Sequence, residues 1–140
     1  MATAMEELDQ AIRSALDGID GIEAISIFGS RAGTRPRPDS DLDIAVLPSA
    51  DLPGGRRMLQ ARIAVTLADL VPDGRVDVVL LDEAPELLRQ RILESGRLLA
   101  LREPVRFRAL RLETMREHGD REPYRRLLLD ALERRLTRSG

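Results

Sequence analysis

The sequence contains no cysteine, no lysine and no tryptophan, and only 2% of its residues are aromatic. Without cysteine the chain has neither disulfides nor thiolate metal sites, which fits a reducing compartment. The scarcity of aromatic side chains argues against base stacking on single-stranded nucleic acid. No apolar run approaches the roughly 20 residues that cross a bilayer, and the first residues do not follow the pattern of a signal peptide. We therefore expect a cytoplasmic protein without a membrane partner.

The length and the charge are those of an ordinary small globular domain. The chain has 140 residues, a hydrophobic fraction of 43% and a formal net charge of −2. This charge argues against direct binding to nucleic acid, because proteins that bind it usually carry a basic excess. All 22 basic residues are arginine. Arginine binds phosphate through two N–H groups at once, although a bias in genomic composition explains the same pattern.

Apolar residues recur at helical and strand spacings in alternation along the chain. The segment 32–40 contains two prolines and a glycine and is expected to be mostly loop. Asp82 is expected in the N-terminal cap of the third helix. The mixed order predicts an α/β sandwich, a mixed sheet flanked by helices with a C-terminal helical tail. The expected helices cover 4–16, 59–70, a third from the cap region at 82–85 to about 95, 104–118 and 123–136, and the expected strands cover 22–28, 41–47, 75–81 and 98–101.

One short motif suggests a chemical site. Gly29 and Ser30 follow the first expected strand, ten residues intervene, and Asp41 and Asp43 then open the second. Residues two apart in a strand share a face, so the two carboxylates are expected to point the same way. Their repulsion is relieved by a cation, and Mg²⁺ prefers such oxygen ligands. The backbone N–H groups of the Gly-Ser turn are suited to binding phosphate.

Asp77 interrupts an otherwise apolar expected strand. A carboxylate placed there faces either water or a paired charge, because burying it alone is costly. If this strand lies beside the second, Asp77 joins Asp41 and Asp43 at one edge of the sheet. Three carboxylates can hold two Mg²⁺ ions about 4 Å apart, the arrangement used for in-line nucleotidyl transfer. The alternative is that Asp77 simply faces solvent.

The spacing Gly29-Ser30, ten residues, Asp41-Leu42-Asp43 resembles the GSx10DxD pattern of the DNA polymerase β nucleotidyltransferase superfamily. The flanking residues 28–32 and 40–46, and the later Val-Asp-Val-Val segment at 76–79, are similar to its minimal nucleotidyltransferases. The resemblance implies a minimal nucleotidyltransferase domain over 1–101, with the polymerase β-like fold. Length and the helical extension over 102–140, expected to pack on the same domain, further resemble MntA-type antitoxins. Their partners are HEPN-domain ribonuclease toxins of the HepT type.

This resemblance implies an enzyme that transfers AMP from ATP to a tyrosine of the toxin and so neutralises it, within a hetero-oligomer. Asp41, Asp43 and Asp77 would bind Mg²⁺, and Asp77 is alternatively a general base toward the attacking hydroxyl. Gly29 and Ser30 would hold the β- and γ-phosphates. The adjacent Arg31 would neutralise triphosphate charge.

Two other functions fit the same sequence: an antitoxin that acts by binding alone, and a nucleotidyltransferase acting on a small molecule. Five further residues are candidates of interest. For the loop residues Arg35 and Arg37, solvated charge is the favoured interpretation, and contact with ATP or a partner is the alternative. The other three are interpreted structurally: Asp39 as a turn residue, His118 at a helix C-terminus, and Tyr124 as a core or oligomer contact.

Overall fold

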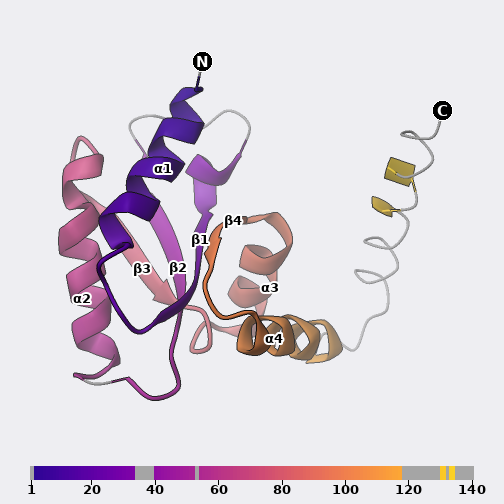
Figure 1. The fold of residues 1–140 in the computed structure, drawn as a ribbon. Coiled ribbons are helices and arrows are strands. Elements are labelled where there is room, and N and C mark those ends of the chain that lie inside the picture. Colours follow the sequence, from indigo (N-terminus) through magenta and orange to yellow (C-terminus); the bar gives the residue numbers. More distant parts are fainter. Residues whose placement is uncertain (1, 34–39, 53, 118–129, 132, 135–140) are drawn as a thin grey trace.

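The computed structural model describes residues 2–33, 40–52, 54–117, 130–131 and 133–134 (Figure 1). Within them the order of elements alternates between helices and strands, as the sequence predicts. Two short 3₁₀ turns, η1 and η2, follow β1 and α2. The elements are α1 Ala4–Leu16, β1 Ile22–Phe28, η1 Gly29–Ala32, β2 Leu42–Pro48, α2 Arg56–Leu67, η2 Ala68–Leu70, β3 Val76–Leu80, α3 Glu86–Ser95, β4 Arg97–Leu101 and α4 Pro104–Glu117.

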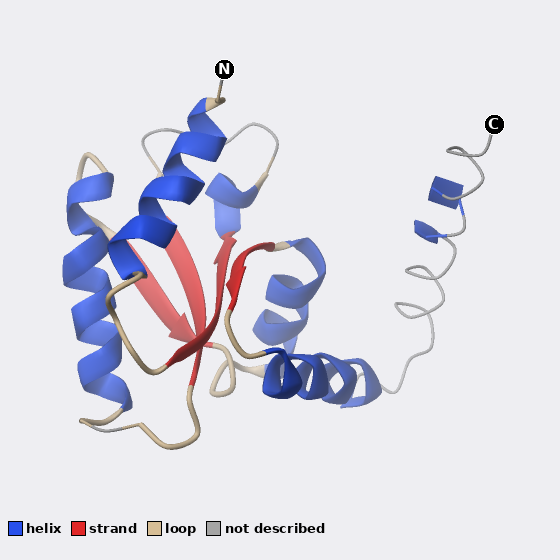
Figure 2. Cartoon of the chain, viewed as in Figure 1, coloured by secondary structure: helices blue, strands red, loops and turns tan. Residues whose placement is uncertain are grey.

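The described strands form one mixed sheet in the order β3-β2-β1-β4. β1 runs antiparallel to both β2 and β4, and β2 runs parallel to β3. Figure 2 shows the sheet between the helix pairs α1–α2 and α3–α4. This arrangement confirms the expected α/β fold class and the expected short edge strand near 98–101.

Alternate residues of the central strands face opposite helix pairs. In β2, Ile44 and Val46 join the core that α1 and α2 cover, whereas Ala45 and Leu47 join the core beneath α3 and α4. Side chains two apart in a strand share a face, so Asp43 lies on the α3–α4 side of the sheet. The strand pattern therefore decides which face carries the site.

The boundaries expected for the second strand and the second helix need correction. β2 begins at Leu42, so Asp41 lies one residue before the strand. α2 ends at Leu67, and the segment up to Leu70 is a separate 3₁₀ turn. The expected helix over 123–136 lies mostly outside the described residues, as do Arg35, Arg37, Asp39, His118 and Tyr124. Along the described part of the chain, no helix combines the length and hydropathy that a bilayer crossing requires.

Asp82 was expected in a helix cap, and this prediction is wrong. α3 begins without a side-chain cap. Instead, Asp82 forms ion pairs with Arg56 of α2 and Arg106 of α4. Arg106 also donates to the Glu23 carboxylate at 3.0 Å and to the Pro48 carbonyl at 2.6 Å. This ion-pair network joins α2, α4 and the sheet at the end where β1 starts and β2 and β3 finish.

Other arginines fasten α1 to the sheet. Arg13 donates from Nε to the Leu99 carbonyl of β4 at 2.7 Å. Arg102 donates to the carbonyls of Leu16 and Ile19 at 2.8 Å each. Leu16 is the last residue of α1, where carbonyls lack partners inside the helix, and Ile19 lies in the segment that follows. The forked guanidinium group thus connects secondary-structure elements here.

A nearly buried ion pair ties α1 to β4. Arg97 donates from Nε and Nη2 to the two carboxylate oxygens of Asp9, at 2.9 and 2.8 Å. Its Nη1 donates to the Ala32 carbonyl in η1 at 2.9 Å. The Asp9 side chain is 9% exposed and that of Arg97 is 25% exposed. One guanidinium group therefore holds the first helix, the edge strand and the turn after β1 together.

Asp9→Asn is expected to lower the free energy of unfolding by about 2 kcal/mol, because it leaves the Arg97 charge without its counter-ion. This loss of stability is smaller than is usual when a fully buried ion pair is broken, because Arg97 keeps some contact with water. Urea unfolding followed by circular dichroism measures this change. Glu7→Gln, on the exposed side of the same helix, is the control and should shift stability by less than about 0.5 kcal/mol. Equal effects of both substitutions would contradict the importance of the pair.

Candidate functional site

The predicted site residues meet at the end of the sheet where β1 finishes and β2 and β3 begin. The strand register places Asp43 of β2 between Phe28 of β1 and Asp77 of β3. Asp41 lies two residues before Asp43, just outside the strand. The sequence prediction that the third strand brings Asp77 beside the second is therefore confirmed.

Asp43 carries the strongest electrostatic signature of the site. Its pKa is raised above the ordinary value of 3.8, first by partial burial, then by the negative charge of Asp77, and then by that of Asp41. Each cause disfavours the ionised form, and two of them are like charges nearby. Asp41 and Asp77 are thus each close enough to Asp43 to disfavour its charge, and a cation would relieve that repulsion.

Asp41 is turned toward a neighbour that the sequence analysis did not single out. Its Oδ1 lies 4.0 Å from Nη1 of Arg75, and the two side chains are 54% and 72% exposed. The backbone supports this placement, because the Leu42 N–H donates to the Arg75 carbonyl at 3.0 Å. The available signal was that Arg75 stands two residues before Asp77, so both occupy one face of the extended segment.

The donor set fits a hard divalent cation such as Mg²⁺. It consists of carboxylate oxygens on two adjacent strands, and the raised pKa of Asp43 reports charge that lacks compensation. In residues 2–33, 40–52 and 54–117, however, no three His, Cys, Asp or Glu side chains are grouped closely enough to hold a metal ion. One of the three carboxylates, that of Asp41, is instead paired with Arg75.

Gly29 has a structural role beside the site. Its φ is +74°, a conformation that side-chain-bearing residues rarely adopt. A Cβ added there would lie 2.2 Å from Oδ2 of Asp43. Glycine is therefore required both by the backbone and by the approach of the carboxylate. Ser30 follows in η1 and is exposed, so its hydroxyl is accessible to a ligand.

Arg31 belongs to the same turn. The residue is 7% exposed, and its Nε donates to the Ser40 carbonyl at 2.9 Å. The bond ties the turn after β1 to the residue that precedes Asp41, so Arg31 brings the two halves of the motif together. Its expected contact with triphosphate stays a prediction.

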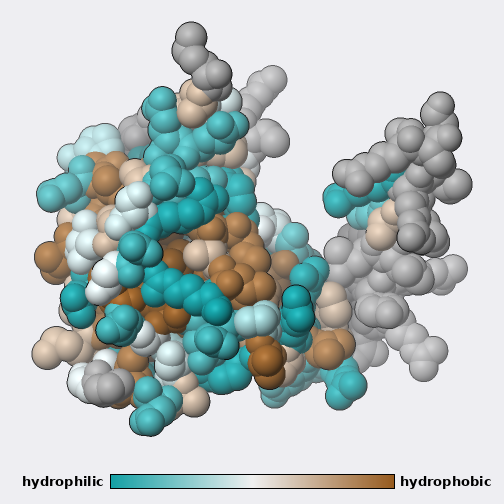
Figure 3. All heavy atoms as spheres, in the orientation of Figure 1, coloured by the Kyte–Doolittle hydropathy of each residue, from teal (hydrophilic) through white to brown (hydrophobic). Residues whose placement is uncertain are grey.

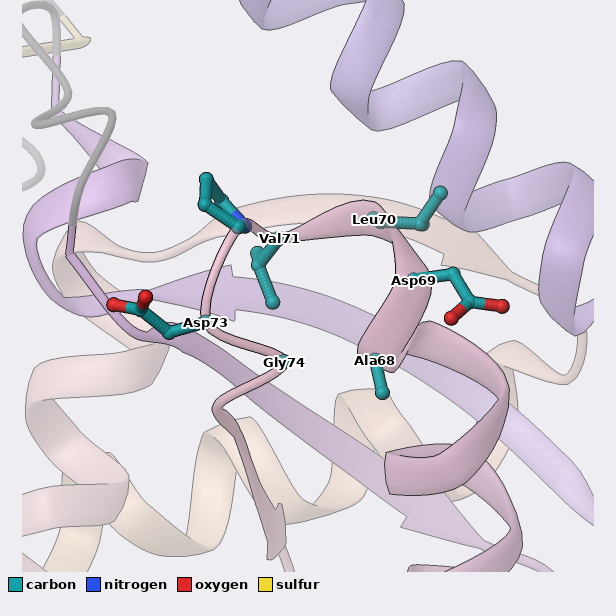
Figure 4. Close-up of a pocket in the computed structure, with 7 residues that line it drawn as sticks. Ala68, Asp69, Leu70, Val71, Asp73 and Gly74 are labelled. Carbon is teal, nitrogen blue, oxygen red and sulfur yellow. The ribbon is translucent and has the colours of Figure 1, made fainter.

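The structure also has a shallow hollow that lies apart from these carboxylates. It is lined by residues 68–74, in and after η2. Figure 4 shows the side chains of Asp69 and Asp73 pointing to opposite sides of it. None of the site residues expected from the sequence lines this hollow. It offers no convergent set of polar groups, so the carboxylate edge remains the candidate site.

Comparison with known proteins agrees with this geometry. Residues 10–104 match the model of the family described as polymerase beta, nucleotidyltransferase. Among functionally curated proteins, none matches the sequence.

Three solved structures illustrate the similarity. A toxin–antitoxin structure with AMP-PNP has 28% identity over 89% of this chain and 98% of that chain, with a TM-score of 0.62. The MntA–HepT toxin–antitoxin structure has 25% identity over 91% of this chain and 97% of that one, with a TM-score of 0.60. The structure of tri-AMPylated Shewanella oneidensis HEPN toxin in complex with MNT antitoxin has 25% identity over 92% of this chain and 98% of that one, with a TM-score of 0.61.

Asp43→Asn is expected to raise the melting temperature at pH 8 by a few degrees. Because the pKa of Asp43 is raised in the folded protein, its ionisation costs stability as the pH rises through that pKa. The cost is absent below about pH 3, well under the ordinary aspartate pKa, where the carboxyl group is protonated in both states, so the advantage of the variant should vanish there. Differential scanning calorimetry at both pH values tests this. Asp51→Asn, at an exposed bend, should show no gain, and a lower melting temperature for Asp43→Asn at pH 8 would contradict the expectation.

Gly29→Ala is expected to lower the free energy of unfolding by about 2 kcal/mol, since it combines an unfavourable φ with a clash against Asp43. Gly33→Ala is the matched control. Gly33 has a φ of −75°, and its added Cβ would meet only the Ser30 carbonyl oxygen, at 3.8 Å. That control should change stability by less than about 0.5 kcal/mol in the same urea titration. Similar losses for the two variants would show that the turn tolerates neither side chain for a more general reason.

Proposed function

Because the chain belongs to the polymerase β nucleotidyltransferase family, we propose that it is the antitoxin of a HEPN toxin–antitoxin pair and transfers AMP from ATP to a tyrosine of the toxin. The observation that carries the proposal is the pairing of Asp43 with Asp77 in adjacent strands, with Asp41 beside them. The solved relatives support the partner and the substrate, since they include a structure with AMP-PNP and an AMPylated HEPN toxin with an MNT antitoxin.

In this proposal Asp41, Asp43 and Asp77 hold Mg²⁺. When bound, the metal neutralises charge on the phosphates of ATP, a large part of what phosphoryl-transfer enzymes contribute. The tyrosine oxygen attacks the α-phosphorus, a new O–P bond forms, and the bond to the β-phosphate oxygen breaks, so that pyrophosphate leaves. Asp77 is exposed on the edge strand, where an approaching hydroxyl can reach it. It would either ligate the metal as the third carboxylate, the phenolic proton then passing to solvent, or act instead as the general base that accepts this proton.

The turn after β1 holds the triphosphate in the proposed complex. Backbone N–H groups of Gly29 and the hydroxyl of Ser30 would donate to the β- and γ-phosphates. Because Gly29 has no Cβ, no side-chain atom stands between this turn and the Asp43 carboxylate. Arg31, in the same turn, would add positive charge, and its hydrogen bond to the Ser40 carbonyl would hold it in position.

A separate part of the surface is available for toxin binding. Apolar side chains gather in the middle of the face shown in Figure 3. In β4, Leu98 and Leu101 are 43% and 37% exposed, and in α4, Val105 and Leu112 are 76% and 54% exposed. None of these residues belongs to the carboxylate site. We therefore expect toxin binding and AMP transfer to be separable by mutation, which also distinguishes an enzyme from an antitoxin that acts by binding alone.

The double variant Asp41→Asn, Asp43→Asn is expected to reduce AMP transfer by at least about a hundredfold, because it removes two of the three charges that hold the metal. The measurement uses labelled ATP, Mg²⁺ and the cognate HEPN toxin, with mass spectrometry of the toxin tyrosines. Asp51→Asn, an exposed aspartate outside the site, is the control and should label the toxin like the wild type.

The same double variant should still bind the toxin in a pull-down, since the apolar surface is unchanged. Equal labelling by the double variant and the wild type would overturn the assignment of the carboxylates. An absence of labelling by the wild type, with toxin neutralised, would favour the antitoxin that acts by binding alone. Transfer of AMP to a small acceptor but never to the toxin would favour a nucleotidyltransferase that acts on a small molecule.

A further inference from the structure

Arg75 occupies a defined corner of the carboxylate site. The parallel pairing of β2 with β3 matches Leu42 to Val76 and Asp43 to Asp77. One residue earlier in both segments, the same register places Asp41 beside Arg75. The N–H of Leu42 donates to the Arg75 carbonyl at 3.0 Å, so the pairing extends to this point.

Four charged side chains consequently stand in a two-by-two array on one face. Asp41 and Asp43 come from one segment, and Arg75 and Asp77 from the other, because residues two apart share a face. Nη1 of Arg75 lies 4.0 Å from Oδ1 of Asp41. The array contains three negative charges and a single positive charge, and the positive charge is paired with the outermost carboxylate.

The contact is of the kind that exchanges easily. Both side chains are more than half exposed, and exposed ion pairs are individually weak because water and salt screen them. Arg97 provides the contrast, since it binds nearly buried Asp9 through two hydrogen bonds and also holds a backbone carbonyl. Arg75 is therefore poorly suited to stabilising the fold and well placed to influence Asp41.

We infer that Arg75 is a positioning residue that competes with a divalent cation for Asp41. This inference rests on the proposed function of the site. Without the cation, the guanidinium group engages the Asp41 carboxylate and offsets part of the repulsion in the array. Binding of the cation requires Asp41 to leave Arg75. The exchange weakens cation binding to the free protein and leaves the guanidinium group beside the site when a metal-bound nucleotide arrives.

Titration with Mn²⁺ in the absence of nucleotide tests this competition directly. Isothermal titration calorimetry or the EPR signal of free Mn²⁺ gives the dissociation constant. We expect Arg75→Gln to bind Mn²⁺ about threefold to tenfold more tightly than the wild type, because Asp41 no longer has a competing partner. Arg75→Lys, which keeps a positive charge, should restore most of the weaker binding. Arg108→Gln, at an exposed position on α4, controls for loss of positive charge elsewhere on the protein.

A double-mutant cycle separates competition from a general electrostatic effect. In an Asp41→Asn background, Arg75→Gln should leave the Mn²⁺ dissociation constant unchanged, because the residue through which Arg75 acts is gone. An equal gain in both backgrounds would overturn the inference, as would an unchanged dissociation constant for Arg75→Gln or no detectable Mn²⁺ binding by any variant. Melting temperatures should agree within about 2 °C, confirming that each variant is folded.

The two proposals fail independently in these experiments. If the wild type transfers AMP to the toxin while Arg75→Gln binds Mn²⁺ like the wild type, the role of Arg75 is wrong and the proposed function stands. If the shift in Mn²⁺ affinity appears but the toxin is never labelled, the competition is real and the proposed function is wrong. A readout independent of catalysis makes this distinction possible.

Discussion

Repulsion around Asp43 is the constraint on which the site depends. Parallel pairing of β2 with β3 places Asp77 in register with Asp43, and the chain direction puts Asp41 two residues away. Partial burial raises the pKa of Asp43, and the like charges of Asp77 and then Asp41 raise it further. An arrangement that costs stability in the free protein is expected where a ligand supplies the missing charge, because binding the cation then relieves the cost.

Arginine performs two kinds of work in this protein, and exposure separates them. Arg97 uses its planar fork to bind nearly buried Asp9 and a backbone carbonyl together, a geometry that lysine does not reproduce. Arg102 donates in the same way to the carbonyls of Leu16, the last residue of α1, and Ile19, which follows it. The pair that Arg75 makes with Asp41 is single, long and exposed. The absence of lysine is thus compatible with structural roles and does not by itself indicate phosphate binding.

The sequence predicted the strands and most helices well because their patterns are local. The apolar segment before Gly29, for instance, reads as a strand without knowledge of its neighbours. The failures involve partners distant in sequence. Aspartate is a residue type that favours helix caps, but Asp82 instead pairs with Arg56 and Arg106, which are 26 and 24 residues away in the sequence. Arg75 could be placed beside Asp41 only once the register of β2 and β3 was known.

The two charge clusters lie at opposite ends of the sheet, so we expect substitutions of the carboxylates to leave the fold intact. The carboxylates stand where β2 and β3 begin, whereas the ion-pair network around Asp82 and Arg106 lies at the other end of these strands. Between them, the buried residues of β1 and β2 form two apolar cores, one on each face of the sheet. Stability therefore comes from the cores and from ion pairs such as that of Arg97 with Asp9. Among the described residues, the carboxylates that raise the pKa of Asp43 stand at the opposite end of the strands from the Asp82 network.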